Sequence, residues 1–291
     1  MTEKTAQKAI LAEELTYQYG DLVAVDHISF DVARGEILGF LGPNGAGKTT
    51  TVKMLTGQFR PRAGRAVILG MDVARQPQQV QGRIGVCFEI TNLYEKMTAA
   101  DNLKLFARLF GRRDLDAEAL LRRVGLAGRG RDKVGTYSKG MKQRLMVARA
   151  IVSEPQVLFL DEPTSGLDPA SSEAIRNIIL EEKERGATIL LTTHDMAEAD
   201  KLSDRVAFMN QGKIVALDTP HNLKQQYGQR ALKAKVSSGG ELVEREVPLD
   251  TPETADDIHK LFATEKVVTI HSAEASLEDI FIQITGRGLE G

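Results

Sequence analysis

The stretch Gly42–Thr49 constrains the fold of this chain more than any other. It matches the pattern GxxxxGK[ST]. It lies between the apolar run Ile37–Leu41 and the segment Thr50–Thr56, whose composition suits a helix. A strand, a glycine turn and a helix start in this order allow the backbone N–H groups of residues 44–49 to surround a phosphate, which the positive end of the helix dipole also attracts. We therefore expect a triphosphate to bind at this loop.

The loop predicts separate roles for two of its side chains. Lys48 is expected to reach the β- and γ-phosphates, and the Thr49 hydroxyl is expected to be a ligand of Mg²⁺. A glycine-rich turn without a ligand is the alternative, but every fixed position of the pattern is filled here. The full set of expected nucleotide contacts in this stretch is Gly42, Pro43, Asn44, Gly45, Ala46, Gly47, Lys48, Thr49 and Thr50.

A second signal is the acidic pair Asp161-Glu162, which ends the apolar run Val157–Leu160. Such a run is typical of a strand that is buried on both faces in a parallel sheet. Asp161 is then placed to hold Mg²⁺ through its water shell, and Glu162 to orient or deprotonate the water that attacks the γ-phosphate. Acidic pairs are common on protein surfaces, so the functional interpretation of this pair depends on the buried strand before it and on the phosphate loop.

The remaining elements predict an α/β domain with an appended module. Residues 1–86 are expected to form a mixed sheet packed on one helix, and a helical subdomain is expected at about residues 88–152. Strands and helices then alternate, which indicates a parallel sheet with helices on both faces. We expect this nucleotide-binding domain to cover residues 1–228 and a small α+β domain to cover residues 229–291.

Composition limits the location and the partners of the chain. Among its 291 residues no apolar stretch reaches the ~18–20 residues that cross a bilayer, and the N-terminus has no secretory signal pattern. We therefore expect a protein of the cytosol, and docking onto a membrane protein stays compatible with this. A formal net charge of −2 gives no overall attraction to nucleic acid, which we do not expect as a partner.

The segment Tyr137–Met141 lies directly ahead of a helix that is expected to begin at Lys142. Ser138 in this segment suits a helix N-cap. The same helix N-terminus can equally present its free N–H groups and the Ser138 hydroxyl to an anion. The residues of this segment do not decide between the two interpretations.

Taken together, these motifs resemble those of the ATP-binding subunits of ATP-binding cassette (ABC) transporters over residues 9–225. The matching stretches, in chain order, are Gly42–Thr49 as the phosphate loop, Tyr137–Met141 as the family signature, Leu158–Thr164 as the magnesium strand with the catalytic glutamate, Ser165–Asp168 as the dimer-contact loop and Thr193–Asp195 with the switch histidine. The resemblance implies the P-loop NTPase fold of ABC ATPases, ATP and Mg²⁺ as cofactors, and ATP hydrolysis as the activity.

The resemblance also implies roles for residues elsewhere in the chain. Tyr19 would stack on adenine, with packing at a strand end as the alternative, and His194 would contact the γ-phosphate and help to hold the attacking water. Ser138 and Gly140 would close over the γ-phosphate bound by a second copy of the chain, and Asp168 would organise the opposing site. ATP is thereby expected between two copies arranged head to tail, and the ambiguity at Ser138 is resolved in favour of function.

Two positions depart from the common family pattern. Glu89 stands where the family usually has glutamine; its carboxylate can still reach Mg²⁺ or the water, but it adds negative charge near the triphosphate. Lys139 replaces a glycine of the signature. Both variations, together with the tail segment Ala275–Phe281, resemble the branch that exports drugs, sodium or antibiotics through separately encoded permeases.

We therefore expect an ATPase subunit that powers transport, in the export direction by resemblance, through a membrane permease. It would work as a pair of copies and lie peripherally on the cytoplasmic face of the cell membrane. A soluble ABC-type ATPase that acts on nucleic acid or ribosomes is the alternative, but such proteins usually carry two cassettes or a long coiled-coil insertion, and this chain has neither. A binding-only regulatory cassette would be expected to lack the catalytic glutamate, which Glu162 supplies.

Overall fold

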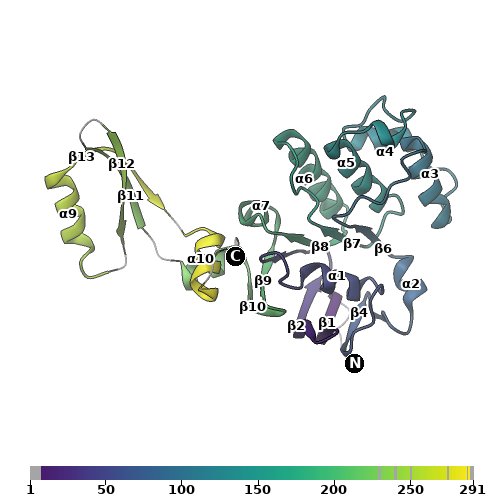
Figure 1. Cartoon of the computed structure of the whole chain (residues 1–291), viewed down its shortest axis with the longest axis horizontal. Helices are drawn as coiled ribbons and strands as arrows, with labels where there is room; N and C mark the ends of the chain where they lie inside the picture. Colours follow the sequence, from purple (N-terminus) through teal and green to yellow (C-terminus); the bar gives the residue numbers. More distant parts are fainter. Residues whose placement is uncertain are drawn as a thin grey trace. The chain divides into compact units, whose positions relative to one another are not determined.

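The computed structural model describes residues 8–228, 231–238, 241–249, 251–273, 275–286 and 288. The chain divides into two compact units, Met1–Leu217 and Asp218–Gly291. Figure 1 shows the elements of both units along the chain. Each unit is described by itself below.

The first unit begins with an antiparallel sheet in the order β2-β1-β4-β5. Its strands are β1 (Lys8–Tyr19), β2 (Leu22–Ala33), β4 (Ala63–Ile68) and β5 (Met71–Asp72). Apolar side chains of β1 and β2 are buried at alternating positions over much of the hairpin, as expected for a sheet with one covered face. This sheet carries Tyr19 at the end of β1, beside the phosphate loop.

The second sheet has six strands in the order β10-β9-β3-β8-β7-β6. They are β3 (Ile37–Leu41), β6 (Ile84–Cys87), β7 (Val157–Asp161), β8 (Thr188–Thr193), β9 (Arg205–Asn210) and β10 (Lys213–Asp218). Every pairing among β6, β7, β8, β3 and β9 is parallel. The carboxyl ends of β3, β7 and β8 consequently lie at one edge, where ligands bind in open α/β sheets.

Helices α1 (Lys48–Leu55), α2 (Pro77–Gln81), α6 (Pro169–Glu184) and α7 (Met196–Leu202) connect the strands. The expectation of one mixed sheet on one helix for residues 1–86 is wrong in detail. The strands described between residues 8 and 87 belong to two different sheets, because β3 and β6 pair with strands that follow residue 156. Alternation of apolar residues identifies a strand without identifying its partner, so such distant pairings do not show in the sequence.

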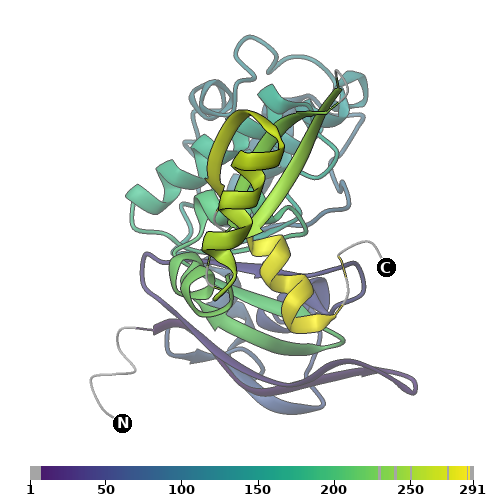
Figure 2. The same cartoon turned by 90° about the vertical axis from the view of Figure 1, so that its left-hand side faces the viewer.

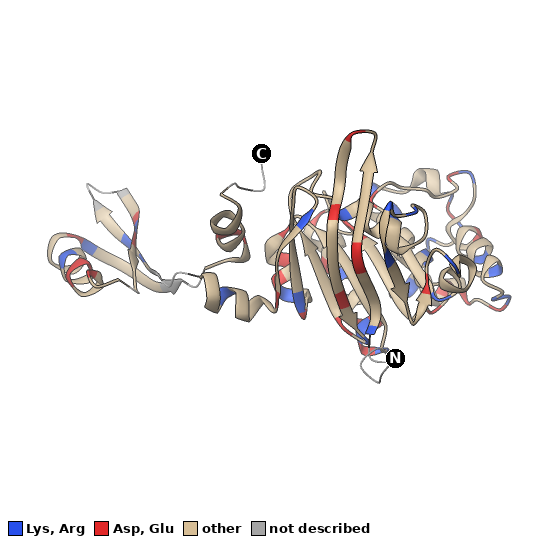
Figure 3. Ribbon diagram, turned by 90° about the horizontal axis from the view of Figure 1, so that it is seen from below, with Lys and Arg blue, Asp and Glu red and all other residues tan. Residues whose placement is uncertain are grey.

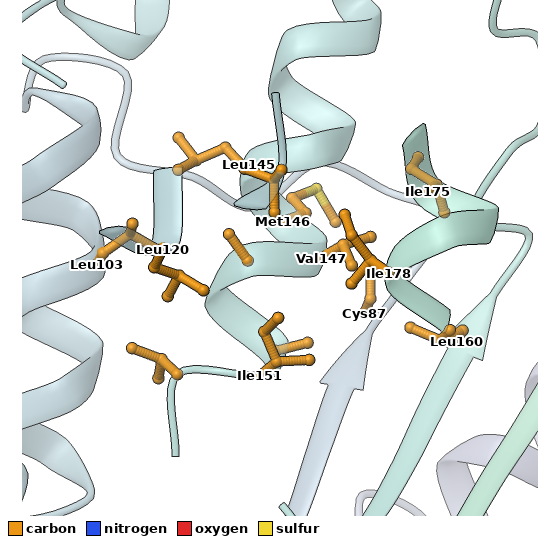
Figure 4. Close-up of a cluster of buried hydrophobic side chains, with 14 of the residues drawn as sticks. Cys87, Leu103, Leu120, Leu145, Met146, Val147, Ile151, Leu160, Ile175 and Ile178 are labelled. Carbon is orange, nitrogen blue, oxygen red and sulfur yellow. The ribbon is translucent and has the colours of Figure 1, made fainter. Parts of the chain in front are cut away.

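A helical subdomain lies between β6 and β7, with α3 (Ala99–Leu109), α4 (Ala117–Arg123), the short 3₁₀ helix η2 (Val134–Thr136) and α5 (Lys139–Ala150). Its core is continuous with one face of the sheet: Figure 4 shows Leu103, Leu120 and Leu145 of these helices in one cluster with Cys87 and Leu160 of β6 and β7. Burial raises the pKa of the Cys87 thiol to about 12, which makes it an inert packing residue.

Ion pairs also fix the helical subdomain to the sheet domain. The Arg123 guanidinium of α4 lies 2.7 Å from a carboxylate oxygen of Glu182 in α6, which is buried. Arg112 contacts Glu154 at 2.8 Å. Figure 3 shows Lys and Arg interspersed with Asp and Glu along the chain.

Helix α5 begins at Lys139, three positions before the predicted Lys142. The Ser138 hydroxyl accepts a hydrogen bond from the Met141 backbone N–H at 3.2 Å, which is the N-cap interaction that starts a helix. The capping interpretation of Ser138 therefore holds for its local structure. The Ser138 side chain is at the same time exposed.

The second unit contains helix α8 (Pro220–Tyr227), helix α10 (Leu277–Thr285) and a three-stranded sheet covered by helix α9 (Thr254–Thr264). The sheet is antiparallel in the order β12-β11-β13, with β11 (Ala231–Ser238), β12 (Glu241–Pro248) and β13 (Lys266–Ala273). Its core includes Ala234, Val236, Val247 and Leu261. Figure 2 shows α9 lying along the strands, so the predicted α+β character is present.

The boundary between the units differs from the predicted one at residue 228. Helix α8, to which the sequence analysis assigned no element, packs against α10 and therefore belongs to the second unit. Leu223 in α8 and Phe281 in α10 are both almost fully buried. The eight-residue α8 carries too few apolar residues for its periodicity to stand out in the sequence.

Candidate nucleotide-binding and hydrolysis site

The phosphate loop connects β3 to α1 through glycines that no other residue can replace without strain. A Cβ atom on Gly42 would lie 2.2 Å from the Met209 carbonyl oxygen, and one on Gly47 would lie 2.5 Å from that of Ala24. Gly47 also has a φ of +106°, a left-handed conformation that L side chains rarely adopt. The loop backbone is thus held against its neighbours in one shape.

Helix α1 begins at this loop without a side-chain cap. Its first helical backbone bond runs from the Thr51 N–H to the Gly47 carbonyl at 2.9 Å. The N–H groups of Lys48, Thr49 and Thr50 have no backbone acceptor among the described residues. Uncapped N–H groups at the positive end of a helix dipole form a binding site for an anion such as a phosphate.

Lys48 places a cation inside this loop, and only 6% of its side chain is exposed. Its Nζ donates hydrogen bonds to the carbonyls of Gly42 at 2.6 Å and Pro43 at 3.2 Å, and it lies 3.5 Å from Glu162 Oε1. Burial lowers the pKa of the Lys48 ammonium, while the neighbouring Glu162 and Asp161 carboxylates oppose that change. A desolvated cation of this kind interacts strongly with a phosphate.

Asp161 and Glu162 leave β7 at the carboxyl edge of the sheet and are both buried. Asp161 Oδ1 accepts hydrogen bonds from the hydroxyls of Thr49 at 3.1 Å and Thr192 at 2.5 Å. Asp161 Oδ2 and Glu162 Oε1 are buried and have no hydrogen-bond donor among the described residues. Buried oxygens without a donor are suited to a cation or an ordered water.

A Mg²⁺ ion would fit this donor set. Asp161 and Thr49 supply oxygen ligands, which Mg²⁺ prefers. The described residues contain no cluster of three or more His, Cys, Asp or Glu side chains suited to a metal. A metal here would therefore take its other ligands from phosphate and water, as is usual for Mg²⁺ at triphosphate sites.

The backbone around Glu162 is unusual for a residue with a side chain. Its φ is +49°, and its N–H donates to both the carbonyl and the hydroxyl of Thr192, each at 3.1 Å. His194 follows β8 and places Nδ1 2.8 Å from Glu162 Oε2, with half of the imidazole exposed. The two oxygens of Glu162 therefore have different neighbours, Lys48 on one side and His194 on the other.

A cavity of about 430 Å³ lies at this site, and its lining includes Tyr19, residues 43–50, Glu89 and Glu162. We refer to it as the nucleotide cavity. The Tyr19 hydroxyl lies 3.4 Å from Thr50 Oγ1, and the residue is 44% exposed. The exposed Glu89 lines the same cavity and adds to the negative charge around Lys48. Gly42, Asp161 and His194 do not line the cavity but contact residues that do.

The other three predicted site residues form a separate group where α5 and α6 begin. Asp168 caps α6 by accepting a hydrogen bond from the Ser171 N–H at 2.9 Å, and these N–H donors hold the pKa of its carboxyl below the usual value. A Cβ on Gly140 would lie 2.6 Å from Ser171 Oγ, so α5 and α6 touch here. None of Ser138, Gly140 and Asp168 lines the nucleotide cavity of its own chain.

Thr192 is a site residue that the sequence analysis missed. It contacts Asp161 and the Glu162 backbone together, and it is completely buried. The available signal was the pair of threonines, Thr192 and Thr193, that ends the strand after three apolar residues and directly precedes His194. Leu22, Val23, Ala24, Gln211 and Gly212 also line the cavity without a sequence signal.

Residues 25–165 of the chain match the protein family described as ABC transporter. A fluoroquinolones export ATP-binding protein of Mycobacterium tuberculosis is 45% identical over 291 residues, which cover 98% of this chain and 96% of that protein. The chain belongs to the ABC transporter ATP-binding proteins. The family predicted from the order of the motifs is thereby confirmed.

Further similarities agree with this assignment. A daunorubicin resistance ATP-binding protein of Streptomyces coeruleorubidus is 38% identical, with 97% of this chain and 91% of that protein covered. A solved ATP-binding subunit of an ABC transporter has a TM-score of 0.69 at 33% identity and covers 75% of this chain and 93% of its own. The predicted α/β P-loop ATPase fold and ATP hydrolysis as the activity are confirmed. No helix in the described part of this ABC subunit is long and apolar enough to cross a membrane.

Proposed function

We propose that this ABC subunit hydrolyses Mg²⁺-ATP as a head-to-tail pair and powers the export of small organic compounds through a separate membrane permease. The pairing of two copies is supported by the fact that the predicted site residues of one chain lie in two separate places. Lys48 and Glu162 border the nucleotide cavity, whereas Ser138 and Gly140 lie outside it in the same chain. A second copy that presents its Ser138 and Gly140 to this cavity completes the site. Because each copy does this for the other, the two contacts are reciprocal and the pair has twofold symmetry.

The residues that line the cavity and those in contact with them have separate roles in hydrolysis. The N–H groups that open α1 and the Lys48 ammonium bind the phosphates, and the Tyr19 ring contacts the base. Thr49 and Asp161 would hold Mg²⁺, which would supply positive charge against the phosphates. Glu162 accepts the proton of the attacking water, and His194, at 2.8 Å, holds the Glu162 carboxylate in place and faces the γ-phosphate.

An exposed apolar surface supports the proposal of a membrane permease as partner. Ile90 follows Glu89 directly and is 81% exposed, and Tyr94 on the same loop and Leu109 at the end of α3 are also exposed. The Tyr94 ring lies 6.4 Å from the Phe106 ring of α3, measured between ring centroids, so this loop and α3 present neighbouring apolar side chains. Neighbouring exposed apolar side chains mark interaction sites. Since this loop continues from Glu89 in the cavity, a permease bound to it would sense the nucleotide, and the subunit would lie on the cytoplasmic face of the membrane.

The cargo class in this proposal comes from the relatives, which are named for fluoroquinolones export and daunorubicin resistance. The test begins with a tagged chain purified from detergent-solubilised membranes, and a polytopic membrane protein is expected to co-purify. Cells that co-express both should then accumulate less of a fluoroquinolone than cells that co-express the permease with the Glu162→Gln chain. Equal accumulation in the two strains would refute export of that class of compound.

Thr192 is expected to be a positioning residue for both carboxylates. Thr192→Val keeps the side-chain shape but removes the hydroxyl that donates to Asp161 and accepts from the Glu162 N–H. Hydrogen bonds to charged groups contribute about 1.5–3 kcal/mol, so ATP turnover should fall by roughly tenfold or more. The Mg²⁺ concentration for half-maximal rate should rise as well.

The matched control for this prediction is Thr193→Val on the same strand. The Thr193 hydroxyl accepts a hydrogen bond from the Asp195 N–H at 3.0 Å and, among the described residues, makes none with Asp161 or Glu162. A steady-state titration of phosphate release against Mg²⁺ compares the two variants. An unchanged Mg²⁺ dependence in Thr192→Val would show that the hydroxyl does not position the metal ligand.

A further inference from the structure

A second cavity, of about 660 Å³, lies at the end of α1 away from the nucleotide loop. Helix α1 begins at Lys48 and ends at Leu55, and this cavity is lined from Met54 onward. Four arginines line it, Arg60, Arg62, Arg65 and Arg75, against the single acid Asp72. We refer to it as the arginine cavity.

The positive charge of the arginine cavity is largely uncompensated. The Asp72 carboxylate already accepts hydrogen bonds from the Ala74 and Arg75 N–H groups, at 2.9 and 3.0 Å. Arg65 pairs with Glu13. Within the residues that the structure describes, the guanidinium groups of Arg60, Arg62 and Arg75 make no ion pair or side-chain hydrogen bond, and all three residues are exposed. Although the net charge of the chain is −2, three unpaired cations lie together at the arginine cavity.

The side chains of the arginine cavity suit a phosphate group as ligand. A guanidinium group presents N–H donors in a planar fork that matches two phosphate oxygens, and it keeps its charge at every physiological pH. The buried side chains of Met54, Ala66 and Val73 form the apolar part of the lining. An anion that also carries aliphatic groups would therefore use both kinds of surface.

The aromatic side chain of the cavity argues against nucleic acid. Single-stranded nucleic acids gain affinity by stacking bases on free aromatic rings. The ring of Phe59, which lines the cavity, is already stacked on Tyr17 with ring centroids 4.9 Å apart. The Lys53 ammonium lies 5.2 Å from the same ring centroid.

We propose that the arginine cavity binds the phosphate of an anionic phospholipid headgroup. The proposal rests on the proposed function in one respect, namely that a subunit bound to a permease lies within reach of the membrane surface. Each basic residue near an anionic membrane surface contributes about 1 kcal/mol to binding. The three unpaired arginines are thus sufficient to give a measurable preference for anionic lipid.

The test is co-sedimentation of the full chain with vesicles of phosphatidylglycerol and phosphatidylcholine, and with vesicles of phosphatidylcholine alone. The triple variant Arg60→Gln, Arg62→Gln, Arg75→Gln should bind the anionic vesicles on the order of a hundredfold more weakly than the wild-type chain. It should hydrolyse ATP at the wild-type rate, because the cavity lies at the far end of α1 from the phosphate loop, and this rate also reports correct folding.

The matched control is the triple variant Arg108→Gln, Arg113→Gln, Arg131→Gln, which removes the same charge from exposed positions of the helical subdomain. It should keep most of the vesicle binding. Loss of binding in the control but not in the cavity variant would assign lipid binding to the helical subdomain and overturn the proposal. Equal losses in both would show attraction by net charge alone and would also overturn it.

Two further outcomes identify the source of the phosphate. Inorganic phosphate at constant ionic strength should not displace the anionic vesicles; displacement at low concentration would assign the cavity to a free phosphate. Equal binding to vesicles with and without phosphatidylglycerol would also refute the proposal. The vesicle assay contains no permease, so its failure is distinct from a failure of the proposed export function, which would show as the absence of a co-purifying permease.

Discussion

Replacing Glu162 by glutamine is expected to lower the ATP turnover number by a factor on the order of 10²–10⁴ while ATP still binds. The amide keeps the shape of the side chain but cannot accept the proton of the attacking water. The two side-chain contacts of Glu162, with Lys48 at 3.5 Å and His194 at 2.8 Å, mark a carboxylate held in one orientation. Its buried Oε1 has the Lys48 ammonium at 3.5 Å but accepts no hydrogen bond from the described residues, so it can still accept one from a water.

Retention of ATP binding follows from the parts of the site that Glu162→Gln leaves unchanged. The N–H groups at the start of α1 and the Lys48 ammonium are provided by the loop itself. The variant should therefore form a long-lived ATP-bound dimer, because closure is retained and hydrolysis no longer reopens it. Gel filtration with ATP and Mg²⁺ measures the dimer, and phosphate release measures turnover.

Glu89 provides the control, since it is the other carboxylate of the same cavity. Glu89→Gln removes an exposed negative charge near the phosphates and should leave turnover within roughly tenfold of the wild-type value, consistent with the modest effect of exposed charges. If Glu89→Gln abolishes turnover and Glu162→Gln does not, the two carboxylates exchange roles in the mechanism. Wild-type turnover in Glu162→Gln would remove Glu162 from it.

The parts of the site that follow from local sequence were predictable, and those that depend on distant pairing were not. Gly42–Thr49 could be recognised from the fixed spacing of its glycines, Lys48 and Thr49, although the close contacts that require Gly42 and Gly47 are made with the distant residues Met209 and Ala24. Asp161 and Glu162 could be placed because a buried strand must end where the parallel sheet ends. Thr192 could not be placed, because its contacts with Asp161 and Glu162 depend on β7 and β8 being neighbours. No local sequence pattern predicts that pairing.

The same distinction explains the errors in the fold. The division of the first strands between two sheets depends on β3 pairing with β8 and β9, which follow it by more than a hundred residues. The early start of α5 depends on a single hydrogen bond of Ser138, and element boundaries are decided by such contacts. The second unit begins with α8 because that helix packs on α10, and this tertiary contact leaves no periodic signal in a short helix.

Ser138→Asp is expected to abolish hydrolysis without weakening the binding of ATP to an isolated chain. Aspartate caps a helix as well as serine does, so α5 should still begin at Lys139. In the proposed pair, however, its carboxylate faces the γ-phosphate of the partner. Two like charges within about 4 Å repel by about 4 kcal/mol at the effective dielectric of a protein surface, enough to reduce turnover by roughly a hundredfold or more.

Ser138→Asn is the matched control, because asparagine caps the helix equally well and carries no charge. It should retain most of the turnover that Ser138→Asp loses. ATP affinity, measured by a fluorescent analogue on dilute protein, should be the same for both variants, since Ser138 does not line the nucleotide cavity of its own chain. A loss of ATP affinity in the monomeric Ser138→Asp chain would place Ser138 in its own site and contradict the head-to-tail pair.

Mixing two inactive variants gives the sharpest form of this prediction. Lys48→Ala removes the buried cation of the phosphate loop, and Ser138→Asp blocks the opposing face. In a mixed pair, one of the two sites combines an intact loop from one chain with an intact Ser138 from the other. An equal mixture should therefore recover about a quarter of the wild-type rate if the sites act independently and the chains pair at random. A pair in which each chain completes its own site would recover nothing, because each variant then carries its defect into the only site it forms.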